Sequence, residues 1–271
     1  MTGNDSNTPF AEKKIVYTIP GAKKVRMKKN VQYGGIEAPS LLMDLYYPSD
    51  VGENVLLPVV IFVSGYSMER IVEMTGRKFK DIAQYTSWGK LIAQVGFIGI
   101  TYDAKQPERD ITALLNFINK NAPSLGINHE KICLWSCSAN SLLAISLLMQ
   151  AGMDDIESVV IYYGILFDQE LEQEIAELTK EVGSVYPSTL KQDDLKLQKI
   201  PVLIVRAGQD QSAVLNRSID LFLARLIDLN YPVQFINYSR GQHGFDVLDD
   251  YKQSRDIIKT TLAFIKDNFR E

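Results

Sequence analysis

The chain has 271 residues, of which 46% are hydrophobic and 23% are charged, and its formal net charge is −4. No apolar segment approaches the roughly 20 residues that a membrane-spanning helix requires, which excludes a transmembrane protein. The acidic balance, with no wide block of Lys and Arg, argues against nucleic acid as the main partner.

The first 14 residues, MTGNDSNTPFAEKK, lack the basic start and apolar centre of a signal peptide. We therefore expect a cytoplasmic protein with a flexible segment at residues 1–14. The rest of the chain has no internal repeat and no linker rich in Pro, Gly and Ser. This favours a single domain spanning residues 1–271.

Two early segments alternate apolar and polar residues, which predicts half-buried antiparallel strands: residues 23–35 and 41–49. The first contains KKVRMKK, which is typical of an exposed edge strand kept soluble by lysine. Later strands are predicted by continuous apolar, β-branched runs, as in sheets covered on both faces by helices. These runs are residues 58–65, 96–103, 131–136, 158–166, 201–208 and 232–239.

Helical patterns, with apolar residues recurring every three or four positions, separate these strands. They cover residues 87–95, 110–122, 140–150, 216–230 and 251–269. The alternation of strand and helix predicts an α/β fold with a doubly wound, mostly parallel, eight-stranded sheet and an antiparallel N-terminal hairpin.

Residues 167–200 depart from this alternation. Leu171, Ile175, Leu178 and Val182 mark one face of an amphipathic helix, and the remainder is too charged for a core. Two interpretations remain open, a solvated surface helix and a small lid over the carboxyl edge of the sheet.

Few residues in the sequence could bind a metal. The only cysteines are Cys133 and Cys137, the only histidines are His129 and His243, and no CxxC or HExxH spacing occurs. We expect reduced thiols and no metal site.

Reactive side chains follow the predicted buried strands, at the edge where ligands collect in parallel sheets. The stretch ICLWSCSANS, residues 132–141, leaves its strand through two serines and a cysteine without any glycine. Similar polar stretches are SGYS at 64–67, RAGQD at 206–210 and GQHGFD at 241–246. Each of these stretches is a candidate for chemistry.

From about residue 25 onward the sequence resembles the α/β-hydrolase family, closest to small bacterial esterases related to dienelactone hydrolases. That family has a strand-to-helix nucleophile elbow, GxSxG, and a triad in the order Ser, Asp or Glu, His. The resemblance implies Ser138 as nucleophile, Asp210 as acid and His243 as base. Asp168, after the sixth strand, is the alternative acid.

In the family's elbow the positions two before and two after the nucleophile crowd together, which favours glycine there. For Ser138 these positions hold Ser136 and Asn140, whereas for the serine at 136 and for Cys137 at least one flank is a large apolar residue. The rule favours Ser138, and Cys137 remains the alternative because dienelactone hydrolases use cysteine. The elbow requires that Asn140 be accommodated beside Ser136.

By position, the resemblance also implies an oxyanion hole made by the backbone N–H groups of Tyr66 and Ala139. The implied activity is a serine esterase acting on a small or medium carboxylic ester, through an acyl-enzyme on Ser138 and without metal or organic cofactor. Pocket walls are expected from the loop at 66–82 and from residues 167–200.

Two other functions remain open. The same triad could act on a peptide or transfer the acyl group to an acceptor other than water. A protein of another class, a binding module with this fold and little or no catalysis, is suggested by the irregular elbow. The first and last strands leave sheet edges available for a homodimer.

Overall fold

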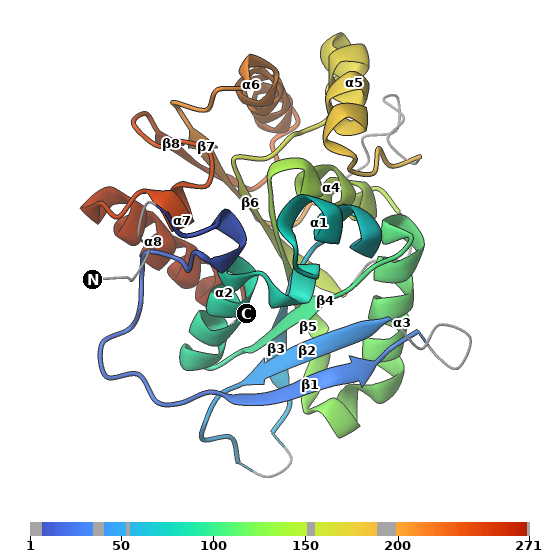
Figure 1. Ribbon diagram of the computed structural model, residues 1–271, viewed down its shortest axis with the longest axis vertical. Helices are drawn as coiled ribbons and strands as arrows, with labels where there is room; N and C mark the ends of the chain where they lie inside the picture. The colour runs from blue at the N-terminus through green and yellow to red at the C-terminus, as the bar shows by residue number, and fades with distance from the viewer. Residues whose placement is uncertain (1–6, 35–40, 53–54, 151–154, 189–198, 270–271) are drawn as a thin grey trace.

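The computed structural model describes residues 7–34, 41–52, 55–150, 155–188 and 199–269. An eight-stranded sheet runs through its centre in the order β1-β2-β4-β3-β5-β6-β7-β8 (Figure 1). The strands are β1 (Arg26–Gln32), β2 (Leu42–Tyr47), β3 (Leu57–Phe62), β4 (Ile98–Tyr102), β5 (Ile127–Cys137), β6 (Ile156–Tyr162), β7 (Val202–Ala207) and β8 (Val233–Tyr238).

The directions of the strands confirm the predicted fold class. β1 and β2 form an antiparallel pair, and β2 is also antiparallel to β4. Every pairing from β4 through β3, β5, β6 and β7 to β8 is parallel. The carboxyl ends of six strands therefore meet at one edge of the sheet, where ligands bind in folds of this kind.

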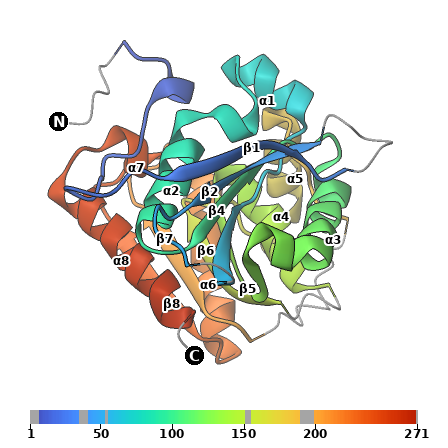
Figure 2. The ribbon, with the colours of Figure 1, turned by 90° about the horizontal axis from the view of Figure 1, so that it is seen from below.

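Helices cover both faces of the sheet, with α2 and α8 on one side and α3 and α4 on the other (Figure 2). The α-helices are α1 (Met68–Thr75), α2 (Ala83–Gln94), α3 (Pro107–Leu125), α4 (Ser141–Leu148), α5 (Glu172–Val182), α6 (Ala213–Asp228), α7 (Phe245–Leu248) and α8 (Lys252–Asn268). Short 3-10 turns are η1 (Phe10–Glu12), η2 (Phe79–Asp81), η3 (Ser138–Asn140) and η4 (Gln169–Leu171).

The central strands are buried on both faces, as their uninterrupted apolar runs predict. Helix α2 lies unusually close to β4 because two glycines meet there. A Cβ built on Gly99 would stand 2.9 Å from the backbone of Gly89. This close contact holds α2 against the sheet, and three side chains of α2 reach the site described below.

The edge strand β1 is exposed along almost its whole length. Its lysines, Lys28 and Lys29, face solvent, which confirms the prediction from KKVRMKK. The strand pairs only with β2 in the described sheet, which makes it an edge strand.

The segment at 66–82, predicted to be a loop, contains helix α1 and the turn η2. The prediction was wrong because α1 has only eight residues, too few to show a clear period. Capping signals were nevertheless present. The Ser67 side chain accepts a hydrogen bond from the Arg70 N–H, and Gly76 ends the helix in the left-handed conformation.

Two predicted segments lie partly outside the described residues. Of the flexible start predicted at 1–14, residues 1–6 are not described, and residues 10–12 form η1. Of the segment at 167–200, residues 189–198 are not described, and the predicted amphipathic helix is α5. No helix in the described ranges is both long enough and apolar enough to span a bilayer.

Candidate active site

The turn from β5 into α4 places Ser138 in a strained backbone conformation. Ser138 has φ = 55°, in the left-handed region that non-glycine residues rarely adopt. Cys137 before it is extended, and Asn140 after it is already helical. A strained serine at a sharp strand-to-helix turn is the geometry of a nucleophile elbow.

Ser138 is also the accessible residue of this turn. All residues from 132 to 148 are described, and within them only Ser138 is not buried. Ser136 is 0% exposed and Cys137 is 3% exposed. A substrate could therefore reach the hydroxyl of Ser138 but neither of the neighbouring reactive side chains.

The Cys137 thiol is poorly suited to act as a nucleophile. Burial raises its pKa to about 12, despite the hydrogen bonds that it makes. The nearest of these joins its Sγ to the Tyr85 hydroxyl at 3.4 Å. Because the thiolate is the reactive species, the Cys137 side chain stays protonated and unreactive at neutral pH.

The two residues that stand where an elbow usually has glycine are both accommodated. The Ser136 hydroxyl donates to Ser141 Oγ at 3.3 Å and is 3.4 Å from the Val160 carbonyl. The Asn140 side chain donates through Nδ2 to the Cys137 carbonyl at 3.0 Å. Both flanking side chains therefore have hydrogen-bond partners within the turn or its neighbours.

Asp210 and His243 are joined by a short hydrogen bond. His243 Nδ1 lies 2.6 Å from Asp210 Oδ2, and the carboxylate is nearly buried while the imidazole is 41% exposed. The other carboxylate oxygen, Oδ1, accepts from the Ser212 N–H at 3.0 Å. With an ionised Asp210, Nδ1 carries the proton and Nε2 is left free as a base.

The loops that carry this pair are tied together. The Gln209 N–H donates to the Gly241 carbonyl at 2.8 Å, and the Gly208 N–H donates to the Tyr238 carbonyl at 2.8 Å. These bonds extend the β7–β8 pairing beyond the strands. Asp168, the alternative acid, instead caps η4 by accepting from the Glu170 N–H at 2.9 Å.

The segment at 163–165, after β6, contacts both the elbow and the histidine. The Ile165 N–H donates to the Ser138 carbonyl at 3.0 Å. The Tyr163 ring lies against the His243 imidazole, with 4.6 Å between centroids. No hydrogen bond joins the Ser138 hydroxyl to His243 among the described residues; such catalytic bonds often tighten only when substrate binds.

The loop after β3 packs against the elbow at Gly65. A Cβ on Gly65 would stand 3.1 Å from Asn140 Cα and 3.3 Å from the Ala139 carbonyl oxygen. Tyr66 follows in this loop and Ala139 lies in the elbow. No hydrogen bond joins the amide of either residue to another described residue.

One fully buried carboxylate that the sequence did not single out is that of Asp246. Asp246 accepts from Trp88 Nε1 at 2.8 Å, from Gln84 Nε2 at 2.9 Å and from the Tyr163 hydroxyl at 2.7 Å. Burial raises the pKa of Asp246, and these hydrogen bonds counteract the rise. Since Tyr163 lies against His243, Asp246 is linked to the imidazole through one side chain.

The backbone of Tyr163 is strained, with φ = 37°, which is unusual for a bulky residue. Its N–H donates to the Val205 carbonyl at 2.8 Å, so the strained residue is held by both its backbone and its hydroxyl. The hexapeptide GQHGFD places Asp246 close after His243 in the chain. This proximity was the only sequence signal for the buried carboxylate.

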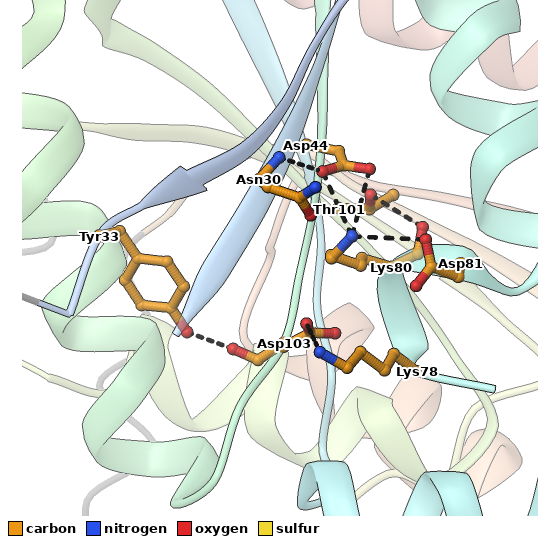
Figure 3. Close-up of polar contacts among 8 residues, drawn as sticks. All are labelled: Asn30, Tyr33, Asp44, Lys78, Lys80, Asp81, Thr101 and Asp103. Atoms are coloured by element: carbon orange, nitrogen blue, oxygen red, sulfur yellow. Dashed lines mark hydrogen bonds and ion pairs between the residues drawn. The ribbon is translucent and has the colours of Figure 1, made fainter. Parts of the chain in front are cut away.

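A second group of charges, in which Asp44, Lys80 and Asp103 are buried, lies around β2 and β4, separated from the elbow strand β5 by β3 (Figure 3). Lys80 Nζ is 3.4 Å from Asp44 Oδ1 and 3.4 Å from Asp81 Oδ1. Asp44 also accepts from the Asn30 N–H at 2.7 Å. Lys78 Nζ stands 3.7 Å from the buried carboxylate of Asp103. No group of three metal-ligating side chains occurs among the described residues.

No known family model matches the sequence, and no curated protein matches it. Solved structures do resemble the fold. A truncated carbohydrate esterase from gut microbiota superposes with a TM-score of 0.69 at 14% identity, over 91% of this chain and 97% of the other. Esterase B from Lactobacillus rhamnosis, inhibited by a tributyrin phosphonate, gives 0.70 at 13% identity, over 92% and 87%.

A third structure, MGS-M1, is an α/β hydrolase from a deep-sea metagenome library. It gives a TM-score of 0.65 at 17% identity, over 91% of this chain and 99% of its own. The chain therefore has the α/β-hydrolase fold, as its strand order and helix layers indicate.

Proposed function

We propose that this protein is a serine hydrolase that cleaves small or medium carboxylic esters. The observation that carries the proposal is the accessible, left-handed Ser138 at the β5–α4 turn. The hydrogen-bonded Asp210–His243 pair, at the ends of the neighbouring strands β7 and β8, supports it. The esterases among structures of the same fold add support at the level of the fold.

The proposed reaction has two acyl transfers. His243 Nε2 removes the proton from Ser138 Oγ, which forms a bond to the ester carbonyl carbon, while Asp210 holds the Nδ1 proton. The N–H groups of Tyr66 and Ala139 donate to the oxyanion. The tetrahedral intermediate collapses, the bond to the alcohol breaks, and His243 returns the proton to the alkoxide.

Water completes the cycle. His243 takes a proton from water as its oxygen attacks the acyl-enzyme, and a second tetrahedral intermediate releases the carboxylic acid. The proton on His243 returns to Ser138 Oγ. Loss of one oxyanion donor in such a site lowers turnover by about 10²–10³-fold, so the two amides contribute on a scale comparable with the triad.

The test is turnover of an activated short-chain ester such as p-nitrophenyl acetate. Ser138→Ala should lower kcat by at least about 10³-fold, since the acyl-enzyme cannot form. Cys137→Ala should retain most of the activity because the buried thiol takes no part. Equal turnover by wild type and Ser138→Ala would contradict the proposal, and loss of activity in Cys137→Ala alone would assign the chemistry to the thiol.

A further inference from the structure

The loop after β3 is held at Gly65 by two hydrogen bonds. The Gly65 N–H donates to Asn140 Oδ1 at 2.7 Å, which ties the loop to the elbow. The Gly65 carbonyl accepts from the Val185 N–H at 2.8 Å, which ties it to the segment after α5. Both polar groups of this buried backbone unit are therefore fixed.

These two bonds determine the direction of the next amide. In a trans peptide the carbonyl of one residue and the N–H of the next point in opposite directions. All described peptide bonds are trans, so the Gly65 carbonyl points to Val185 and the Tyr66 N–H points away from that segment. Because Asn140 occupies the Gly65 N–H, the donor left to the loop at this point is Tyr66.

The Asn140 side chain is itself fixed in one orientation. It is 2% exposed, and its Nδ2 donates to the Cys137 carbonyl at 3.0 Å and lies 3.3 Å from the Tyr85 hydroxyl. Exchanging Oδ1 and Nδ2 would place two donors together at Gly65 and two acceptors together at Cys137. The amide is therefore oriented by its partners, and a glycine at 140 would have no group with which to reach Gly65.

We propose that Asn140 is a positioning residue for the oxyanion hole, which holds the Gly65–Tyr66 peptide so that the Tyr66 N–H faces the carbonyl attacked by Ser138. This inference rests on the proposed function. Asn140 stands where a nucleophile elbow usually has glycine. Its side chain bonds directly to the loop after β3, which a glycine could not do. The bond from the Val185 N–H makes Val185 part of the same support.

The kinetic test is Asn140→Ala, with Ser146→Ala as the matched control. Ser146 is fully buried in α4, and among the described residues its hydroxyl bonds only within its own helix, to the Leu143 carbonyl at 2.8 Å. We expect Asn140→Ala to lower kcat and the rate of phosphonylation about tenfold or more, with KM within about threefold, because the oxyanion exists only after attack. Ser146→Ala should match wild type.

The structural test uses amide hydrogen exchange, which needs no activity. In wild type the Gly65 amide should be protected by its bond to Asn140, and in Asn140→Ala it should exchange at least about tenfold faster. If Asn140→Ala does not fold, Gly65→Ala tests the same contact from the loop. Its Cβ would meet the elbow backbone, so kcat should fall with little change in KM.

Three outcomes decide between the proposals. A wild-type kcat in folded Asn140→Ala, or a Gly65 amide equally protected in both proteins, would overturn the inference while leaving the esterase proposal intact. An equal loss of kcat in Ser146→Ala would assign the effect to general loosening of α4 and would also overturn it. Failure of wild type to react at Ser138 would overturn the proposed function and, with it, the catalytic role of Asn140.

Discussion

Two buried carboxylates in this molecule are stabilised in different ways. Asp246 is surrounded by neutral donors from Trp88, Gln84 and Tyr163, all at hydrogen-bond distance. Asp103, beside the ion pair of Asp44 and Lys80, has a lysine amino group 3.7 Å away. The first carboxylate reaches the imidazole of His243 through Tyr163, whereas in the described part of the chain no hydrogen bond or ion pair joins the second group of charges to the proposed triad.

The different partners of the two carboxylates indicate that Asp246 and the charges around Lys80 have different roles. Neutral donors hold a buried carboxylate in a fixed geometry, so Asp246 fixes the ring that packs on His243. Buried ion pairs depend on both partners being present, and removal of one leaves an uncompensated charge. We therefore expect changes around Asp246 to affect turnover and changes around Lys80 to affect stability.

The largest effect on kcat is expected from Asp210→Asn. This variant shows how much turnover is lost when the proposed orientation of His243 is lost completely. The amide can donate to Nδ1 and so favours the tautomer with the proton on Nε2, which cannot act as a base. We expect kcat to fall by about 10⁴-fold with a free energy of unfolding within about 1 kcal/mol of wild type. Ester hydrolysis and urea denaturation measure the two quantities.

Lys80→Met tests whether the buried ion pair of Lys80 and Asp44 contributes to stability rather than to turnover. It leaves the buried Asp44 without its cation, and we expect the free energy of unfolding to fall by about 3–5 kcal/mol. The kcat of the folded protein should stay within about twofold of wild type. The double variant Asp44→Asn/Lys80→Met should recover part of the lost stability, because the Asn30 N–H still finds an acceptor.

A tenfold loss of kcat in folded Lys80→Met would show that the ion pair and the site are coupled, against this division of roles. A double-mutant cycle tests whether Asp246 and Lys80 contribute to stability independently. Asp246→Asn and Lys80→Met, which share no contact, should be additive within about 0.5 kcal/mol in stability.

Asp246→Asn should lower kcat about tenfold, between the effect of Asp210→Asn and none. One carboxylate oxygen becomes a donor facing other donors, which loosens Tyr163 and costs about 1–3 kcal/mol of stability. Tyr163→Phe is the matched control, since it keeps the ring beside His243 and removes only the hydroxyl with its bonds to Asp246 and Gln84. If Asp246→Asn lost stability but no turnover, Asp246 would be a structural carboxylate only.

The smallest effect is expected from Asp103→Asn and appears in the pH dependence of stability. Burial raises the pKa of Asp103 from 3.8 to about 6, outweighing the effect of Lys78 and Lys80. The folded chain then binds this proton more tightly than the unfolded chain does. The resulting stabilisation is complete below the unfolded pKa and is lost as the pH rises through about 6.

Asparagine does not titrate, so the stability of wild type should fall relative to Asp103→Asn between pH 4 and pH 7. Thermal unfolding of both proteins across this range measures the difference. A constant difference in Tm would contradict a raised pKa at Asp103, and the activity of the two proteins should agree throughout.

Much of the fold was predictable because its signals are local. The apolar runs predict the parallel strands, and the lysine alternation in KKVRMKK predicts the exposed edge. The short helix α1 was missed because eight residues cover barely two turns, although Ser67 and Gly76 marked its ends. Ser138, Asp210 and His243, which the resemblance to α/β hydrolases implied, follow β5, β7 and β8, and the structure brings the last two into contact.

The supporting residues could not be predicted in the same way. Gln84 and Trp88 lie more than 150 positions from Asp246, and only the close packing of α2 on β4 brings them to the carboxylate. Asn140 was noted in the sequence, but the sequence indicated only that its side chain is larger than the glycine usual at this crowded turn. Its role depends on Gly65, 75 positions away, and on the orientation of one amide.

The most direct test of the account is the site at which a fluorophosphonate probe reacts with the native protein. Peptide mapping by mass spectrometry should locate a single phosphonyl group on Ser138, and Ser138→Ala should remain unlabelled. An adduct on Cys137 or on another serine, or a wild-type protein that stays unmodified while fully folded, would contradict it.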